Sequence, residues 1–120
     1  MRILVIEDEA RILAFVARGL EAEGFSVVGA TDGAEGLRLA NDVPCDLVLL
    51  DCNMPGIDGF ETLAQIRQIA PRVDVVMMTA TEDEAMAGRA RASGAAAFIK
   101  KPFYPADIDA VITRIYGGSN

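Results

Sequence analysis

Residues 47–59, LVLLDCNMPGIDG, decide the fold and raise the first functional question. The stretch begins with four consecutive apolar residues, a pattern typical of a central strand in a parallel sheet that is covered on both faces. The apolar run ends in Asp51, just before a turn that contains Pro55 and Gly56. Because a strand this apolar gains nothing from a terminal carboxylate, Asp51 is the first candidate for a chemical role.

The rest of the chain alternates between short apolar runs and helical patterns. Strands are predicted at residues 3–6, 25–29, 46–51, 73–78 and 96–100, and helices at residues 9–23, 32–41, 59–70, 81–94 and from Pro105 onward. Asp32 with Glu35, and Thr81 with Glu84, have the spacing of capping boxes at two helix starts. This alternation indicates an α/β fold, a doubly wound five-stranded parallel sheet with helices on both faces.

The length of the chain bounds its organisation. A chain of 120 residues can form one domain with a sizeable core and is too short for two. We therefore expect residues 1–120 to form a single domain, in which residues 117–120, Gly-Gly-Ser-Asn, are typical of a tail or the stump of a linker.

Charge and composition exclude several classes of function. The net charge of −7 argues against direct binding to nucleic acid, which needs a basic surface. No apolar run approaches the roughly 20 residues that cross a bilayer, so no membrane partner is expected. The chain has no histidine and two cysteines, which excludes Ser-His-Asp triads, Cys-His nucleophiles and the usual zinc sites. A reduced cysteine pair favours the cytoplasm as the compartment.

Polar residues stand at the carboxyl ends of four predicted strands. They are Glu7 and Asp8, Asp51, Thr79 and Lys101. Each has a purely structural explanation when taken alone, such as helix capping for the acidic pair or a solvated edge for the lysine. In doubly wound sheets, however, ligands bind beyond the carboxyl ends of the strands. The coincidence at four strand ends therefore predicts a site.

The chemistry of this set is that of a phosphoryl acceptor. Closely placed carboxylates repel one another and favour a hard divalent cation, and ligands that are all oxygen favour Mg²⁺. One carboxylate can attack phosphorus in line, while a lysine and a hydroxyl contact phosphoryl oxygens.

Four stretches together carry a resemblance to a known family: ILVIEDE, LVLLDCNMPGIDG, VVMMTA and FIKKPF. On these, the chain resembles from end to end the receiver domains of bacterial two-component response regulators. The resemblance implies a flavodoxin-like sheet with strand order 2-1-3-4-5. It also implies a signalling domain that is phosphorylated, and not an enzyme in the ordinary sense.

The resemblance implies a role for each acidic residue of the set. Asp51 is the expected phosphoacceptor, which receives its phosphoryl group from a histidine kinase or a phosphotransfer protein. Glu7 and Asp8 match the acidic pair that holds Mg²⁺ together with Asp51, and Asn53 is expected to contribute its backbone carbonyl.

The resemblance also assigns the residues that sense the phosphoryl group. Lys101, directly before Pro102, matches the lysine of the family, whereas neighbouring Lys100 should point to the opposite face because side chains alternate along a strand. Thr79 matches the switch hydroxyl and Phe98 the switch aromatic. The expected output is a change in the fourth helix, fifth strand and fifth helix, which regulates a downstream protein or a covalently linked output domain.

The chain departs from the family pattern in three places. Residues 94–97, Gly-Ala-Ala-Ala, lack the acidic pair that many relatives carry after Gly-Ala, which makes relatives that dimerise through charged residues on this face poor templates. Phe98 lacks the hydroxyl of the more familiar tyrosine. Cys52 beside the acceptor is unusual, and a small packing residue is favoured over a redox sensor.

The alternative enzyme class is a phosphatase of the haloacid dehalogenase kind. Those enzymes use Asp-x-Asp, in which the second carboxylate protonates the leaving group. Here Asn53 stands at the second position and cannot supply that proton. A dinucleotide-binding module is weaker still, because Gly29, Gly33 and Gly36 do not form G-x-G-x-x-G.

Overall fold

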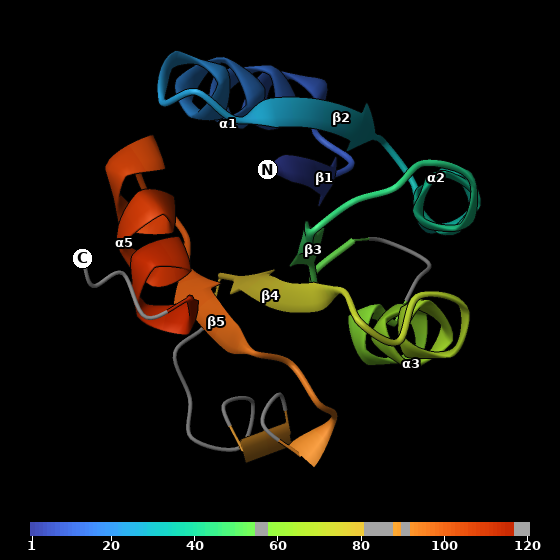
Figure 1. Ribbon diagram of the computed structural model, residues 1–120. Helices are drawn as coiled ribbons and strands as arrows, with labels where there is room; N and C mark the ends of the chain where they lie inside the picture. Colours follow the sequence, from blue (N-terminus) through green and yellow to red (C-terminus); the bar gives the residue numbers. More distant parts are fainter. Residues whose placement is uncertain (55–57, 81–87, 90–91, 117–120) are drawn as a thin grey trace.

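Parallel pairing of short apolar strands organises the molecule. The computed structural model describes residues 1–54, 58–80, 88–89 and 92–116. Within this part of the chain, one five-stranded parallel sheet has the strand order β2-β1-β3-β4-β5, as predicted (Figure 1). Its strands are β1 (Arg2–Ile6), β2 (Ser26–Ala30), β3 (Leu47–Asp51), β4 (Asp74–Thr79) and β5 (Ala97–Lys100).

The helices begin and end close to their predicted limits. They are α1 (Ala10–Ala22), α2 (Gly33–Asp42), α3 (Gly59–Ile69) and α5 (Pro105–Ile115). The helix predicted at residues 81–94 lies mostly outside the described residues, as does its capping box at Thr81 and Glu84; residues 88, 89 and 92 are helical.

Helix starts follow the capping chemistry of the sequence. Asp32 caps α2, because its Oδ1 accepts the Glu35 N–H at 2.7 Å. The Glu35 carboxylate accepts the backbone N–H of Thr31, the residue before the N-cap, at 3.3 Å. The first bond of the predicted capping box is therefore present, and the return bond lies one residue earlier than in the standard motif. Asp58 caps α3 by accepting the Phe60 N–H at 2.9 Å.

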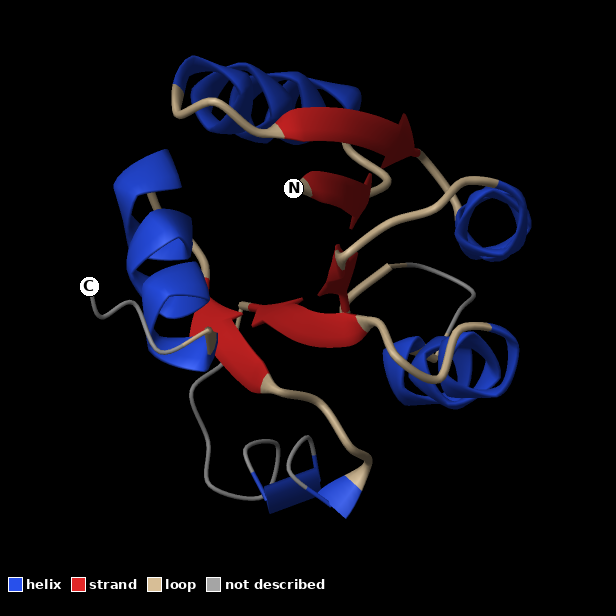
Figure 2. Cartoon of the chain, in the orientation of Figure 1, coloured by secondary structure: helices blue, strands red, loops and turns tan. Residues whose placement is uncertain are grey.

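The two faces of the sheet are covered by different helix pairs. Helices α1 and α5 cover one face, and α2 and α3 cover the other (Figure 2). Ile3 and Val5 pack among residues of α1 and α5, whereas Leu4 and Ile6 pack among residues of α2 and α3. This alternation follows from the two-residue period of a strand. It confirms helices on both faces, and it explains why β3 is apolar throughout until Asp51: Leu47 to Leu50 are all fully buried.

The pairing register brings the carboxyl ends of the strands to one edge. Ile6 pairs with Leu50, and Asp51 pairs with Met78 on the next strand. Thr79 is the last residue of β4, one position later than the predicted strand end, because its carbonyl still accepts an N–H from the chain beyond β5. Residues that follow β1, β3 and β5 therefore lie close together.

A close contact between α1 and α5 holds the segment after β5 in place. A Cβ atom built on Gly19 would lie 2.0 Å from Cγ of Pro105, the first residue of α5. Only a residue without a side chain fits there while α5 keeps its position against α1.

We predict that Gly19→Ala lowers the free energy of unfolding by about 1–3 kcal/mol, since overpacking forces the two helices apart. Urea denaturation monitored by circular dichroism measures the effect. Gly88→Ala is the matched control, because a Cβ there meets no heavy atom of the described residues within 4 Å. Equal urea midpoints for the two variants would contradict the prediction.

Candidate functional site

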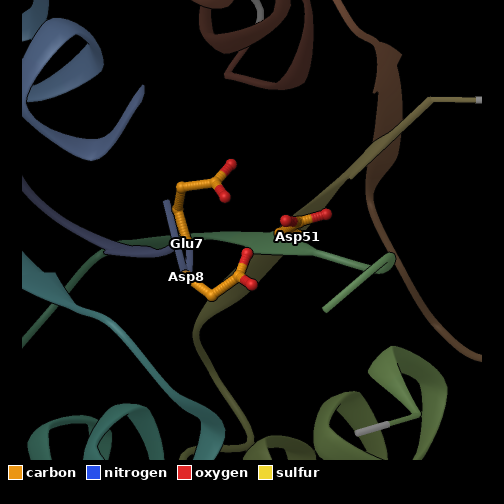
Figure 3. A group of neighbouring side chains, drawn as sticks. All are labelled: Glu7, Asp8 and Asp51. Carbon is orange, nitrogen blue, oxygen red and sulfur yellow. The ribbon is translucent and has the colours of Figure 1, made fainter. Parts of the chain in front are cut away.

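Three carboxylates gather where β1 and β3 end (Figure 3). Glu7 follows β1 and is fully buried, Asp51 ends β3 with 2% of its surface exposed, and Asp8 is exposed. One oxygen from each carboxylate lies within 4.8 Å of the others. The strand order explains the grouping, because β1 and β3 are neighbours in the sheet although residues 8–46, which form helices, a strand and loops, separate Glu7 from the start of β3 at Leu47.

Lys101 joins two of these carboxylates. Its Nζ lies 2.8 Å from Oε1 of Glu7 and 3.0 Å from Oδ2 of Asp51. Its backbone is positioned by the sheet, since its N–H donates to the Thr79 carbonyl at 2.7 Å. Lys100, the last residue of β5, is exposed. The structure therefore brings Lys101, and not Lys100, to the acidic cluster.

Burial and charge shift the pKa values of the paired groups. Burial raises the pKa of Glu7, the charge of Asp51 raises it further, and hydrogen bonds from Lys101 and the Glu9 N–H oppose the rise. Burial alone would lower the pKa of Lys101, but hydrogen bonds to Glu7 and Asp51 outweigh it and raise the pKa. The ammonium group is thus held in its charged form by the two carboxylates.

Asn53 connects the acceptor turn to the next strand. Its N–H donates to Oδ1 of Asp51 at 2.9 Å, which closes an Asx turn, and its own Oδ1 accepts the Ala80 N–H at 2.8 Å. The Asp-x-Asn spacing is a local signal for the first bond. The second bond was missed by the sequence reasoning, which assigned Asn53 only a backbone carbonyl, because nothing local to residue 53 indicates a partner 27 residues away.

The two predicted switch residues share a face of the sheet. Thr79 is fully buried at the end of β4, and Phe98 on β5 is half-buried and packs on the side of α2 and α3. Phe98 pairs with Met77, which stands two residues before Thr79. Side chains two residues apart point to the same face, so Phe98 lies next to the column that ends in Thr79.

Cys52 belongs to the same face and is half-buried beside Asp51. Burial raises the pKa of its thiol, the opposite of what a reactive thiolate requires. This direction agrees with the expectation of a packing role.

The donor set fits a hard divalent cation. All ligands offered by Glu7, Asp8 and Asp51 are carboxylate oxygens, which such cations prefer. When all three are ionised they carry three negative charges, against the one positive charge that Lys101 contributes. The excess negative charge at a largely buried position favours binding of a cation beside the strand ends.

Comparison with known proteins identifies the family. Residues 3–113 match the response regulator receiver domain. The chain belongs to this family. The predicted resemblance is thus confirmed.

Two relatives show how much of a longer protein the receiver domain represents. The alkaline phosphatase synthesis transcriptional regulatory protein PhoP of Bacillus subtilis is 34% identical over 114 residues, which cover 95% of this chain and 48% of PhoP. Transcriptional regulatory protein PdtaR of Mycobacterium tuberculosis is 40% identical over 110 residues, which cover 89% of this chain and 52% of PdtaR. The chain spans about half the length of these relatives.

Solved receiver domains share the whole fold. The receiver domain protein from Clostridium thermocellum has a TM-score of 0.87 at 33% identity and covers 98% of this chain and 94% of its own. A response regulator from Burkholderia pseudomallei, solved with a phosphorylated aspartic acid, a calcium ion and citrate, has a TM-score of 0.88 at 26% identity and covers 98% of this chain and 69% of its own. These matches confirm the predicted fold class.

Across residues 1–54, 58–80, 88–89 and 92–116, no helix combines the length and the apolar character that spanning a membrane requires.

We predict that Mg²⁺ raises the melting temperature of the protein, because a cation that binds only the folded state stabilises it by mass action. Asp8→Asn should remove most of this rise, and its exposed position leaves the core intact. Asp42→Asn is the control, since Asp42 is exposed and paired with Arg38 on α2. Thermal unfolding across a Mg²⁺ titration provides the measurement, and an Asp8→Asn variant that responds like the wild type would refute the site.

Proposed function

We propose that the protein accepts a phosphoryl group on Asp51 from a histidine kinase or a phosphotransfer protein, with Mg²⁺ bound beside it. The observation that carries this proposal is the setting of the Asp51 carboxylate. One oxygen accepts the Asn53 N–H, the other faces the Lys101 ammonium group at 3.0 Å, and two further carboxylates lie beside it.

In the proposed transfer, an ionised oxygen of Asp51 attacks phosphorus in line with the bond to the donor. A bond forms between this oxygen and phosphorus, the bond between phosphorus and the donor's histidine nitrogen breaks, and that nitrogen takes the electron pair. The hydrogen bond from Asn53 orients the carboxylate before attack. Lys101 is close enough to Asp51 to contact a phosphoryl oxygen after transfer.

Magnesium, held by Glu7, Asp8, Asp51 and the backbone carbonyl of Asn53, would neutralise charge on the phosphoryl oxygens. Support for this ligand set comes from the three grouped carboxylates. The Burkholderia pseudomallei response regulator, which was solved with a phosphorylated aspartic acid and a calcium ion, offers a parallel in a related protein.

The phosphatase alternative finds no support at Asn53. Its amide cannot give a proton to a leaving group, and its Oδ1 already accepts the Ala80 N–H. We therefore propose a signalling role in which the chain itself only acquires and loses its phosphoryl group.

We further propose how the phosphoryl group is read. It adds negative charge and strong acceptor oxygens at Asp51, towards which the Thr79 hydroxyl turns. Phe98, now half-buried, rotates into the space that this movement vacates. The result is a population shift of β5, α5 and the segment 81–94, which the sequence predicts to be helical.

The proposed output is a downstream protein or a linked output domain. Relatives about twice as long as this chain include transcriptional regulators, which favours a linked output domain in such proteins. The free thiols of Cys45 and Cys52 fit a reducing compartment, and we propose that signalling takes place in the cytoplasm.

The first functional prediction concerns the acceptor. Asp51→Asn should abolish labelling by a small acyl phosphate donor in the presence of Mg²⁺, and a chelator should abolish labelling of the wild type. Mass spectrometry of the intact protein detects the added phosphoryl group. Asp46→Asn, which changes the aspartate just before β3, should label normally. Undiminished labelling of Asp51→Asn would rule out the assignment.

The second separates the two lysines. Lys101→Ala should lower either the rate of labelling at Asp51 or the response of the switch residues to that labelling by at least about tenfold, equivalent to about 1.4 kcal/mol. Lys100→Ala should leave both close to wild type, because Lys100 is exposed outside the acidic cluster. Stopped-flow labelling and amide chemical shifts provide the measurements. The reverse ranking would overturn the role given to Lys101.

The third concerns the switch hydroxyl. Thr79→Ala should label at Asp51 as the wild type does, since the carboxylate and its partners remain. It should lose most of the phosphorylation-dependent change at Phe98, measured as backbone amide chemical shifts with and without beryllofluoride as a phosphoryl mimic. A variant whose shifts change as much as those of the wild type would exclude the hydroxyl from the switch.

A further inference from the structure

Cys52 is hydrogen-bonded to both of the last residues of β4. Its N–H and its thiol both contact the Met78 carbonyl, with N···O and S···O distances of 2.9 and 2.8 Å. The register that pairs Asp51 with Met78 sets Cys52 beside Thr79, with both side chains on the same face of the sheet. A hydrogen bond with the Thr79 side chain lowers the pKa of the Cys52 thiol, against the larger effect of burial. Since the thiol proton faces Met78, the Thr79 hydroxyl is the donor in the second bond.

The start of α3 packs closely against Cys52. A Cβ built on Gly59, the first residue of α3, would lie 2.6 Å from Cα and 2.8 Å from Cβ of Cys52. Residue 52 is thus confined between the start of α3 and the end of β4. Its thiol donates to the Met78 carbonyl, which orients the sulfur at the end of β4.

The Thr79 hydroxyl has a single proton to donate. It cannot donate to Cys52 and to a phosphoryl oxygen on Asp51 at the same time. A thiol sulfur is a weak acceptor, whereas a charged phosphoryl oxygen is a strong one. The two acceptors therefore compete for one proton. When Asp51 is phosphorylated, the stronger acceptor takes the hydrogen bond from the Thr79 hydroxyl.

We propose that Cys52 is a positioning residue that holds the Thr79 hydroxyl in its resting orientation and releases it when Asp51 is phosphorylated. This inference rests on the proposed function, because it needs a phosphoryl group at Asp51. The acceptor strength at residue 52 then sets how readily the domain switches. A weak acceptor keeps the resting state preferred without blocking the response.

Replacement of Cys52 by a weaker and a stronger acceptor tests the proposal. Cys52→Ala removes the resting partner of Thr79, and Cys52→Ser offers a hydroxyl oxygen in place of sulfur. Each is titrated with beryllofluoride in saturating Mg²⁺, and the amide shift of Phe98 gives the midpoint. Apparent affinity follows the fraction of the chain in the competent state, so the midpoint reports the switching equilibrium.

We expect Cys52→Ala to bind beryllofluoride about two- to tenfold more tightly than the wild type and Cys52→Ser to bind it more weakly by a similar factor, the range that one hydrogen bond supplies. Cys45→Ala, which changes the other half-buried cysteine, should match the wild type. Equal midpoints, or shifts of both Cys52 variants in the same direction, would overturn the proposal, because lost packing acts without regard to acceptor strength.

A double-mutant cycle adds a readout that packing would not produce. In a Thr79→Ala background, the midpoint is read from the amide shift of Asn53, whose N–H donates to Asp51. Both Cys52 substitutions should leave this midpoint unchanged, because the hydroxyl that they act through is gone. Effects that persist without the hydroxyl would overturn the proposal.

A measurement on the intact thiol covers the case in which a Cys52 variant does not fold. In Cys45→Ala, Cys52 is the only thiol of the chain. Its infrared S–H band should shift when beryllofluoride and Mg²⁺ are added, since the sulfur loses its bond from Thr79. A band that does not move contradicts the proposal.

Labelling with a small acyl phosphate separates the two possible failures. A wild-type protein that takes no label at Asp51 contradicts the proposed function. Normal labelling together with equal midpoints contradicts the role of Cys52 alone.

Discussion

The contact of Lys101 with two buried carboxylates is the interaction on which the rest of the site depends. Glu7 and Asp51 are almost completely buried, and like charges in such surroundings destabilise a fold unless an opposite charge faces them. Lys101 supplies that charge from beyond β5, although β4 stands between β5 and β3 in the sheet. Its long side chain must therefore cross the end of β4, where Thr79 lies.

This arrangement makes the sheet order a requirement of the chemistry. The carboxylates come from neighbouring strands β1 and β3, the hydroxyl from β4 and the ammonium group from the segment after β5. A parallel sheet brings all four to one edge, since every strand ends on the same side. Helix packing also holds this edge of the sheet in place, because α3 packs against Cys52 and α5 packs against Gly19.

Much of the fold and the set of site residues could be predicted from the sequence because both depend on local patterns. The apolar run before Asp51 indicates a central strand, and the spacing of Asp32 and Glu35 indicates a helix start; both are present. Strand alternation allows only one of Lys100 and Lys101 to face the site. The choice of Lys101 came from the family resemblance, in which the lysine stands directly before a proline, and it agrees with the observed contacts.

The connections across the fold could not be predicted in the same way. The bond between Asn53 and Ala80, the contacts of Cys52, and the position of Arg89 over the Phe60 ring at 4.2 Å all join distant segments. Each depends on how strands and helices pack, and no periodicity in the sequence records it. The end of β4 differed by one residue for a related reason, since pairing with the chain beyond β5 extends the strand.

The distance along the chain between Glu7 and Lys101 has a consequence for protein synthesis. The hydrogen bond between them joins residues that are 94 positions apart in the sequence, so it can form only after the intervening strands and helices have been synthesised. A ribosome releases the amino-terminal segments first, and these can begin to collapse before the carboxyl-terminal part exists. A nascent chain that has emerged only as far as β4 carries Asp51 but lacks the ammonium group that completes its surroundings. The group of side chains around Asp51 is therefore complete only after β5 and the segment that follows it have emerged.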